Sequence, residues 1–455
     1  MSDPIIGPVK LDGVNFQTWL LKFDKHGNCE SKKTQQALLQ HLHDTPPPAI
    51  VLFSHGWNNE YGDATGLYRR FLFELQRHFA DHPPTIPLLF VGVIWPSTWM
   101  SFDTGPRSAS ATVAAELPDP QEQLSQRLAE EWAANLAVPD RQRLISLLAS
   151  TRLDQAQAKQ LTDLLSRALR NIGGHVPEAL ESTAPDAGEL FKALTSVQRL
   201  TMSSVSADDT NDEAHALIGS LGDPQSAGLL DIFDPRNAIR IASLYQMKDR
   251  AGTVGTNGVS ALLSQLKAAA PLVPLHLVGH SFGAKVVMSA LASYQGEKIE
   301  SVLLLQPAIS YLCMARALPD EPDRHGAFRD VATNVRQALM ITYSGHDGPL
   351  HDFFHLALLR DKDVGEFVPR PASPSEQAGK PPNKYAALGG YGPPGSDAPH
   401  ANVPEAGDTS LRIHLGDPPL ALDGTIDKRI NGHGDVATPI TAWLLYLQLR
   451  AGVQP

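Results

Sequence analysis

The sequence has few cysteines, no excess of basic residues and no long apolar run. Its 455 residues include two cysteines, Cys29 and Cys313, which are too few for a disulfide framework and lack the spacing of a metal site. The formal net charge of −11 argues against nucleic acid, or an anionic membrane, as the main partner. No apolar run is long enough to cross a bilayer, so we expect no integral membrane segment.

Residues 1–10 lack the basic region and apolar core of a secretory signal. We therefore expect a cytoplasmic protein. Export by a signal-free route is the alternative, because it would leave no mark in the sequence. The hydrophobic content of 42% is enough for a large core, and the length indicates about two or three domains.

Residues 275–287 join an apolar run to a helical pattern through a serine that stands between two glycines. The sequence Gly279-His280-Ser281-Phe282-Gly283 fits G-x-S-x-G in the strand, turn and helix context that the motif requires. Such a turn lifts the serine hydroxyl clear of the sheet, and its packing leaves no room for side chains at Gly279 and Gly283. The stretch resembles the nucleophile elbow of the α/β-hydrolases, and the resemblance implies that Ser281 is the nucleophile. A glycine-rich turn with an idle serine is the structural alternative.

A second motif, His55-Gly56-Trp57, follows a continuous apolar run at residues 49–53 that is typical of a buried strand. In α/β-hydrolases this motif supplies one backbone N–H of the oxyanion hole, and the residue after the nucleophile supplies the other. Carried over by position, the resemblance implies the N–H groups of Trp57 and Phe282 as donors. Without the elbow, the motif would be interpreted as a simple glycine turn. Trp95-Pro96-Ser97, at the end of the next apolar run, is similar to a bacterial branch of mostly uncharacterised α/β-hydrolases.

A serine hydroxyl is a poor nucleophile at neutral pH, so it needs a base and a carboxylate that orients the base. In α/β-hydrolases the chain order is Ser, then Asp or Glu, then His. Asp347 lies in a glycine-flanked turn just after a predicted strand at 335–343, and the resemblance implies that it is the acid. His433 lies between glycines in a loop after residues 411–415, which we interpret as the last strand. The resemblance implies that His433 is the general base.

Other titratable residues compete for these roles. Asp352 is the alternative acid, although it lies inside a predicted helix, and Asp435 is interpreted as the N-cap of the final helix. His280 is interpreted as a residue that either packs beside the nucleophile or supports the site from behind the residues that touch substrate. His351 and His355 stand one helical turn apart, as two metal ligands would. The chain has no H-E-x-x-H motif, however, and we expect neither a metal nor a cofactor.

Residues 101–235 interrupt the alternation of strands and helices. We predict a helical insertion of about four or five helices here, between two parts of the core at 1–100 and 236–455. The insertion could be a lid over the site, as helices often are in this family. A cap in this family usually follows the elbow, however, whereas this insertion precedes it, so a separate interaction subdomain is the alternative. Gly252, Gly255 and Gly258 are interpreted as a flexible joint.

The resemblance covers residues 16–100 and 236–450. It implies an α/β-hydrolase fold, with a mostly parallel central sheet flanked by helices. The implied activity is that of a serine hydrolase cleaving a carboxylic ester, with a small-molecule or lipid ester as substrate. Amide or thioester hydrolysis would use the same triad. Two other classes stay open: an interaction module on a hydrolase scaffold with residual activity, and a lipase-type toxin delivered to another cell.

Overall fold

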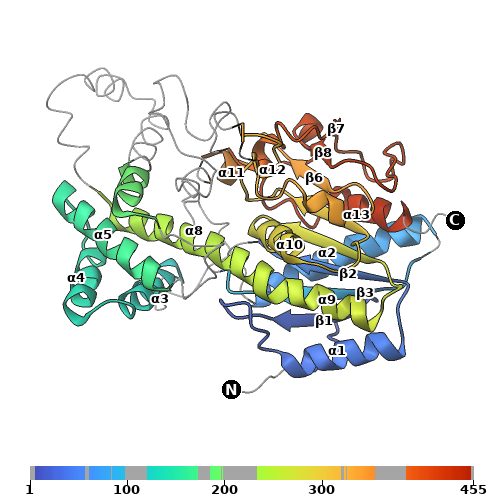
Figure 1. Ribbon diagram of the computed structural model, residues 1–455, viewed down its shortest axis with the longest axis horizontal. Coiled ribbons are helices and arrows are strands. Elements are labelled where there is room, and N and C mark those ends of the chain that lie inside the picture. Colours follow the sequence, from blue (N-terminus) through green and yellow to red (C-terminus); the bar gives the residue numbers. More distant parts are fainter. Residues whose placement is uncertain are drawn as a thin grey trace, which may run out of the picture. The chain divides into compact units, whose positions relative to one another are not determined.

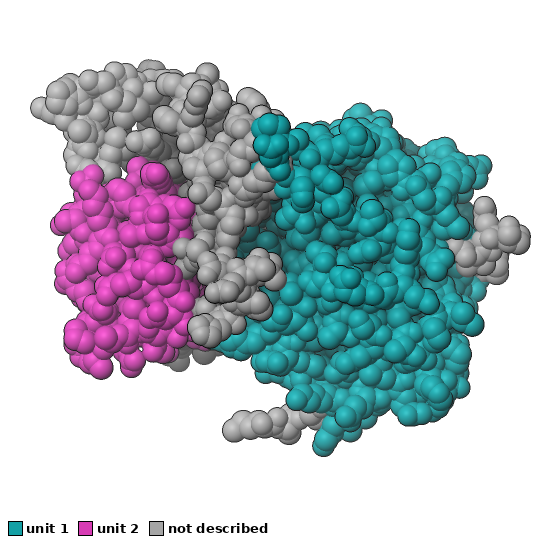
Figure 2. Space-filling view, viewed as in Figure 1, with its two compact units in different colours: residues 1–98, 247–455 teal, residues 99–246 magenta. Residues whose placement is uncertain are grey.

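The chain folds into two compact units, which comprise residues 1–98 with 247–455, and residues 99–246 (Figure 2). The chain passes from the second unit back to the first between residues 246 and 247, inside helix α8 (Pro235–Thr253). The computed structural model describes residues 6–56, 61–83, 85–97, 120–172, 185–195, 197, 233–318, 322–323, 325–352, 354 and 386–451.

One parallel sheet of eight strands organises the first unit, in the order β1-β3-β2-β4-β5-β6-β8-β7. The expected α/β class, with a mostly parallel sheet between helices, is therefore confirmed (Figure 1). The strands are β1 (Gln17–Lys22), β2 (Ala49–Ser54), β3 (Leu88–Ile94), β4 (Leu275–His280), β5 (Ser301–Leu305), β6 (Met340–Tyr343), β7 (His400–Asn402) and β8 (Leu420–Asp423).

Helices cover both faces of this sheet. Side chains alternate between the faces along a strand, and Val51 and Phe53 of β2 belong to the core cluster that α2 and α13 complete. Helices α1, α9 and α10 form a second packed group, in which α10 contacts β2 and β4. The helices of this unit are α1 (Lys32–Asp44), α2 (Tyr61–Asp81), α9 (Ser260–Ala269), α10 (Phe282–Ser293), α11 (Gly348–Asp352), α12 (Leu388–Tyr391) and α13 (Pro439–Ala451).

The glycine-rich stretch before β4 is helical. A π-helical turn, Val254–Val259, joins α8 to α9 in one continuous run. A Cβ atom added to Gly255 would lie 2.4 Å from the carbonyl oxygen of Val286 in α10, and one added to Gly258 would lie 2.5 Å from that of Gly27. The prediction of a flexible joint was therefore wrong, because these glycines permit close backbone packing within a helix.

The last strand along the chain is β8, whereas the alternating pattern predicted residues 411–415. Residues 411–415 make a single antiparallel bridge, from Leu415 to Gln337, and Leu415 is 67% exposed. An alternating pattern forms a strand in a sheet only where its apolar face can be buried. Instead the short run after Pro418 and Pro419 pairs with β6.

In residues 120–172, 185–195, 197 and 233–246, the second unit is mainly helical, with one antiparallel bridge between Leu153 and Phe233. Helices α3 (Pro120–Ala133), α4 (Val138–Leu148) and α5 (Gln155–Ile172) pack against one another around the buried side chains of Trp132, Leu144 and Leu161. Within the parts of the chain given above, no helix has both the length and the apolar content to span a membrane.

Candidate active site

Ser281 stands between β4 and α10 with φ 55° and ψ −124°. A residue other than glycine seldom adopts a positive φ, and the cost of such strain is about 1–3 kcal/mol. Hydrogen bonds hold the turn, because the N–H of Ser281 donates to the carbonyl of Leu305 at 3.1 Å and its own carbonyl accepts the N–H of Ala308. The Ser281 side chain is buried, and its hydroxyl has no hydrogen-bond partner among the described residues. This is the backbone conformation that a nucleophile elbow requires.

The two glycines of the motif sit in close backbone contact. A Cβ atom added to Gly279 would lie 2.7 Å from the Cα atom of Ala284, and one added to Gly283 would lie 2.1 Å from the carbonyl oxygen of Ser54. Real Cβ atoms do not approach other atoms so closely, so a side chain at either position would push α10 away from the sheet. Only glycine therefore fits at positions 279 and 283.

Asp347 and His433 form a buried pair. Nδ1–H of His433 donates to Oδ2 of Asp347 at 2.8 Å, and Oδ1 of Asp347 accepts the N–H of Leu350 at 3.1 Å. Asp347 is fully buried, and His433 is nearly so. Because a carboxylate can only accept hydrogen bonds, it fixes the imidazole proton on Nδ1 and leaves the lone pair of Nε2 as the basic site.

The parallel sheet brings the three predicted residues to one edge. Ser281 follows β4 directly, Asp347 follows β6 by a short turn, and His433 lies in the loop after β8. Parallel strands have their carboxyl ends at the same edge of the sheet. His280, the residue before the nucleophile, donates from Nε2 to the carbonyl of His433 at 3.0 Å, so the base lies beside the elbow.

The turn after β2 lies against the serine. A Cβ atom added to Gly56 would be 2.8 Å from the Cβ atom of Ser281 and 2.7 Å from Nδ1 of His280. The predicted oxyanion donor Trp57 lies outside the described residues. The other predicted donor, Phe282, is the first residue of α10, and its ring packs against Phe354 with centroids 5.9 Å apart.

His55 holds the turn before Gly56 in place. Its Nε2 accepts the backbone N–H of Trp95 at 3.3 Å, and its Nδ1–H donates to the carbonyl of Gly56 at 2.8 Å. The rings of His55 and Trp95 stack with centroids 5.7 Å apart. Full burial lowers the pKa of His55 to about 4, so this histidine is neutral at physiological pH. Trp95 is thus a core residue that orders the turn.

One of the competing carboxylates has a structural role. Asp435 accepts the N–H of Asn431 at 2.7 Å and closes the loop that carries His433. It is not the N-cap of the final helix, because α13 begins at Pro439 and the hydroxyl of Thr438 accepts the N–H of Thr441. The pattern was misinterpreted because both roles use a carboxylate close to a helix start.

Of the two histidines at the spacing of metal ligands, the structure describes only His351. His351 pairs with the carbonyl oxygen of Ser344 at 3.0 Å. His355 and the side chain of Asp352 lie outside the described residues. In the ranges that the structure describes, no three His, Cys, Asp or Glu side chains are grouped as a metal site would require.

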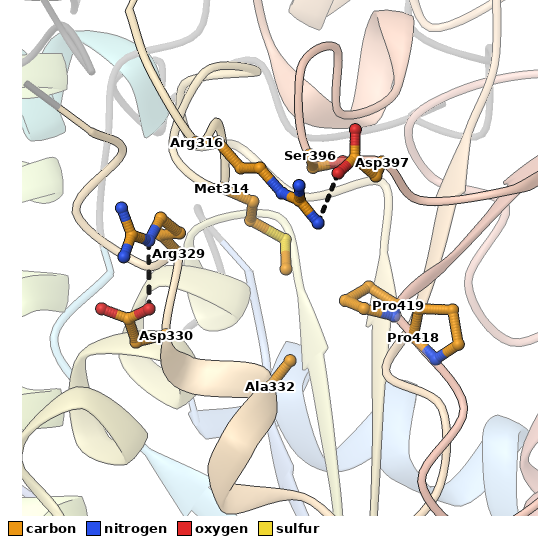
Figure 3. Close-up of a pocket in the computed structure, with 9 residues that line it drawn as sticks. All are labelled: Met314, Arg316, Arg329, Asp330, Ala332, Ser396, Asp397, Pro418 and Pro419. Carbon is orange, nitrogen blue, oxygen red and sulfur yellow. Dashed lines mark hydrogen bonds and ion pairs between the residues drawn. The ribbon is translucent and has the colours of Figure 1, made fainter. Parts of the chain in front are cut away.

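A pocket of about 400 Å³ lies elsewhere in the first unit and includes none of the predicted site residues (Figure 3). Arg316 and Arg329 line it, but each is ion-paired, with Asp397 and Asp330 respectively. Both arginines are substantially exposed, so the pairs are solvated and give the pocket little net charge. We assign it no role in catalysis.

Gln306 is the residue at this edge that sequence reasoning missed. It follows β5 with φ 38° and is fully buried. Its amide donates to the carbonyls of Gly432 and Asp435 at 3.1 and 3.3 Å, on either side of the base. A polar residue that ends an apolar run at the carboxyl end of a central strand is the signal that marks it, because ligands and catalytic groups collect at that edge.

No protein-family model matches this chain, and comparisons with curated proteins and with solved structures find no match either. Any function of this protein must therefore be inferred from the geometry of the site.

Proposed function

We propose that this protein is a serine hydrolase of the α/β-hydrolase type that cleaves carboxylic esters. One observation carries the proposal: a strained, buried serine and a buried Asp–His pair both follow the carboxyl ends of strands in one parallel sheet. The contact from His280 to His433 supports their proximity, because it links the residue next to the nucleophile with the base itself. An idle serine would not need the strain of its backbone conformation.

In the proposed mechanism, Oγ of Ser281 attacks the acyl carbonyl while Nε2 of His433 accepts the hydroxyl proton. The carboxylate of Asp347 stabilises the imidazolium that forms and keeps its orientation. The C–O bond to the leaving group then breaks, and His433 gives the proton to the departing alcohol. Water, deprotonated by His433, hydrolyses the acyl-enzyme and regenerates Ser281. These steps need no cofactor.

The tetrahedral intermediate places a negative charge on the former carbonyl oxygen. We assign its stabilisation to the backbone N–H groups of Phe282 and Trp57. The contact of Gly56 with Ser281 supports this assignment, because it brings the turn before Trp57 against the nucleophile. An oxyanion donor typically contributes about 2.7–4 kcal/mol to transition-state stabilisation.

A small-molecule or lipid ester is the substrate class that we propose. An ester expels an alcohol, which is a better leaving group than the amine of an amide, so an activated serine with two oxyanion donors is sufficient. A hydrolase requires an activated nucleophile, whereas an interaction module on a hydrolase scaffold would not. The reactivity of Ser281 therefore distinguishes the two functions.

Labelling with a fluorophosphonate probe tests the proposal. We expect the wild-type protein to be labelled and Ser281→Ala to lose all labelling. His433→Ala should be labelled at least about 100-fold more slowly, since general-base catalysis contributes 10²–10⁴-fold. Ser289→Ala is the matched control, because Ser289 is also a buried serine but lies within α10.

A series of p-nitrophenyl esters then measures the preferred acyl chain length. If the folded wild-type protein is not labelled, or if Ser281→Ala labels at the wild-type rate, the proposed function is wrong. In that case the interaction module becomes the leading interpretation.

A further inference from the structure

The predicted base stands between two glycines that contribute no side-chain packing to its loop, although Ile430 and Val436 of the same loop are buried in the core. The loop follows β8 and leads to α13, and glycines flank His433 on both sides. A Cβ atom added to Gly432 or Gly434 would meet no atom within 4 Å. Something other than packing at these positions must therefore define the path of the backbone around His433.

Two buried side chains from the neighbouring strand ends bind this backbone. Nε2–H of His280 donates to the carbonyl of His433 at 3.0 Å. The side-chain amide of Gln306 donates to the carbonyls of Gly432 and Asp435 at 3.1 and 3.3 Å. The carbonyls of Gly432, His433 and Asp435 thus all accept hydrogen bonds from side chains at the ends of β4 and β5.

The two donors are themselves fixed. His280 ends β4, where it pairs with Leu305 of β5, and Gln306 is the next residue after Leu305. Oε1 of Gln306 accepts the hydroxyl of Thr342 at 3.3 Å, which turns the amide nitrogen toward the loop. Both side chains are buried. Burial and the neighbouring His433 keep the pKa of His280 well below its usual value, so it stays a neutral donor.

We propose that His280 and Gln306 are positioning residues. They hold the backbone of the loop and thereby fix how closely the His433 imidazole approaches Ser281. The rings of His280 and His433 also pack together, with centroids 5.0 Å apart. The inference rests on the proposed function, in which His433 is the base. It gives the histidine after Gly279 a role in the elbow, because its side chain contacts the base loop.

Three variants test the proposal. His280→Leu removes the donor and keeps an apolar volume, His280→Gln restores an N–H donor, and Gln306→Met removes the amide donors from the other side. His276→Leu is the matched control, because His276 is also a buried histidine of β4, and its hydrogen bond goes to Ser301 rather than to the loop.

The measurements are the fluorophosphonate labelling rate, kcat and KM for a p-nitrophenyl ester, and the low-field NMR signal of Nδ1–H of His433. A misplacement of about 1 Å lowers rates by about 100-fold. We expect His280→Leu and Gln306→Met to lower the labelling rate and kcat by about 10- to 100-fold while KM changes little. The low-field signal should shift or broaden in both, His280→Gln should recover most of the rate, and His276→Leu should keep the wild-type rate.

The results separate this proposal from the proposed function. If the wild-type protein is labelled and both His280→Leu and Gln306→Met are labelled at its rate, the positioning role is wrong and the hydrolase function stands. If His280→Gln is as slow as His280→Leu, the hydrogen bond is not the cause and the proposal fails. If the wild-type protein is not labelled, the hydrolase function fails, and the NMR signal alone decides whether these residues position His433. Gln306→Met takes the place of His280→Leu if the latter does not fold.

Discussion

Replacing Asp347 with asparagine would test the tautomer of the proposed base. Oδ1 of Asp347 accepts the N–H of Leu350, and Oδ2 accepts Nδ1–H of His433 at 2.8 Å. An asparagine would keep its carbonyl oxygen on the Leu350 N–H and turn its NH₂ group toward Nδ1, since the amide nitrogen cannot accept a hydrogen bond. His433 would then carry its proton on Nε2, which is the nitrogen that has to accept the serine proton.

The wrong tautomer lowers kcat of a serine triad by about 10⁴-fold, which corresponds to about 5.5 kcal/mol of transition-state stabilisation. We expect Asp347→Asn to lower the fluorophosphonate labelling rate and the ester kcat by this factor. Substrate binding does not involve Asp347, so KM should change by less than about threefold. Cooperative unfolding in urea checks that the fold is intact.

Asp24→Asn is the control for the loss of a hydrogen-bonded carboxylate. Asp24 accepts hydrogen bonds at both oxygens, from His26 and Asn28, in a turn after β1. It should label at the wild-type rate. A labelling rate for folded Asp347→Asn within tenfold of wild type would refute the assignment of Asp347 as the orienting acid.

Three further predictions concern close packing and buried histidines. Gly56→Ala places a Cβ atom 2.7 Å from Nδ1 of His280 and should slow labelling by about 100-fold; a rate equal to that of Gly62→Ala, where nothing lies within 4 Å, would contradict this. Gly255→Ala brings a Cβ atom within 2.4 Å of a backbone oxygen of α10. It should lower the free energy of unfolding by about 1–3 kcal/mol in urea titrations, and an unchanged midpoint would argue against close packing there. Burial lowers the pKa of His276 to about 3. The unfolded state therefore binds more protons below pH 6.5, and His276 removes about 2 kcal/mol of stability between pH 6.5 and 5. His276→Leu should unfold with a correspondingly smaller pH dependence, and an unchanged dependence would refute the shift.

The core strands could be predicted because they are buried on both faces. Residues 49–53 form a continuous apolar run, and the corresponding strand β2 is buried at every position. The last strand could not be found in this way, because Leu420 to Asp423 is short and follows two prolines. The alternating residues at 411–415 gave the stronger local signal, yet burial in the folded protein decides which segment joins the sheet.

The error in the last strand left the predicted base in the right loop, because residue 433 follows both the wrong segment and β8. Chain order and the motif around Ser281 were sufficient to propose the triad, since each of its residues has a chemically distinctive side chain. The residues that hold the loop have no such signature. His280 and Gln306 act on backbone carbonyls, and any donor of suitable length could do so; only the geometry of the strand ends identifies them.

The same geometry connects the two halves of the proposed site. His280 contacts the base loop through Nε2, and its Nδ1 faces the Cα atom of Gly56 in the turn that leads to the proposed oxyanion donor. A shift of this one ring would therefore disturb proton transfer and oxyanion binding together. A change at Gly56 would reach the base through the same ring. The two variants Gly56→Ala and His280→Leu should thus be less than additive in their effect on the labelling rate, because neighbouring residues with a shared contact couple in a double-mutant cycle.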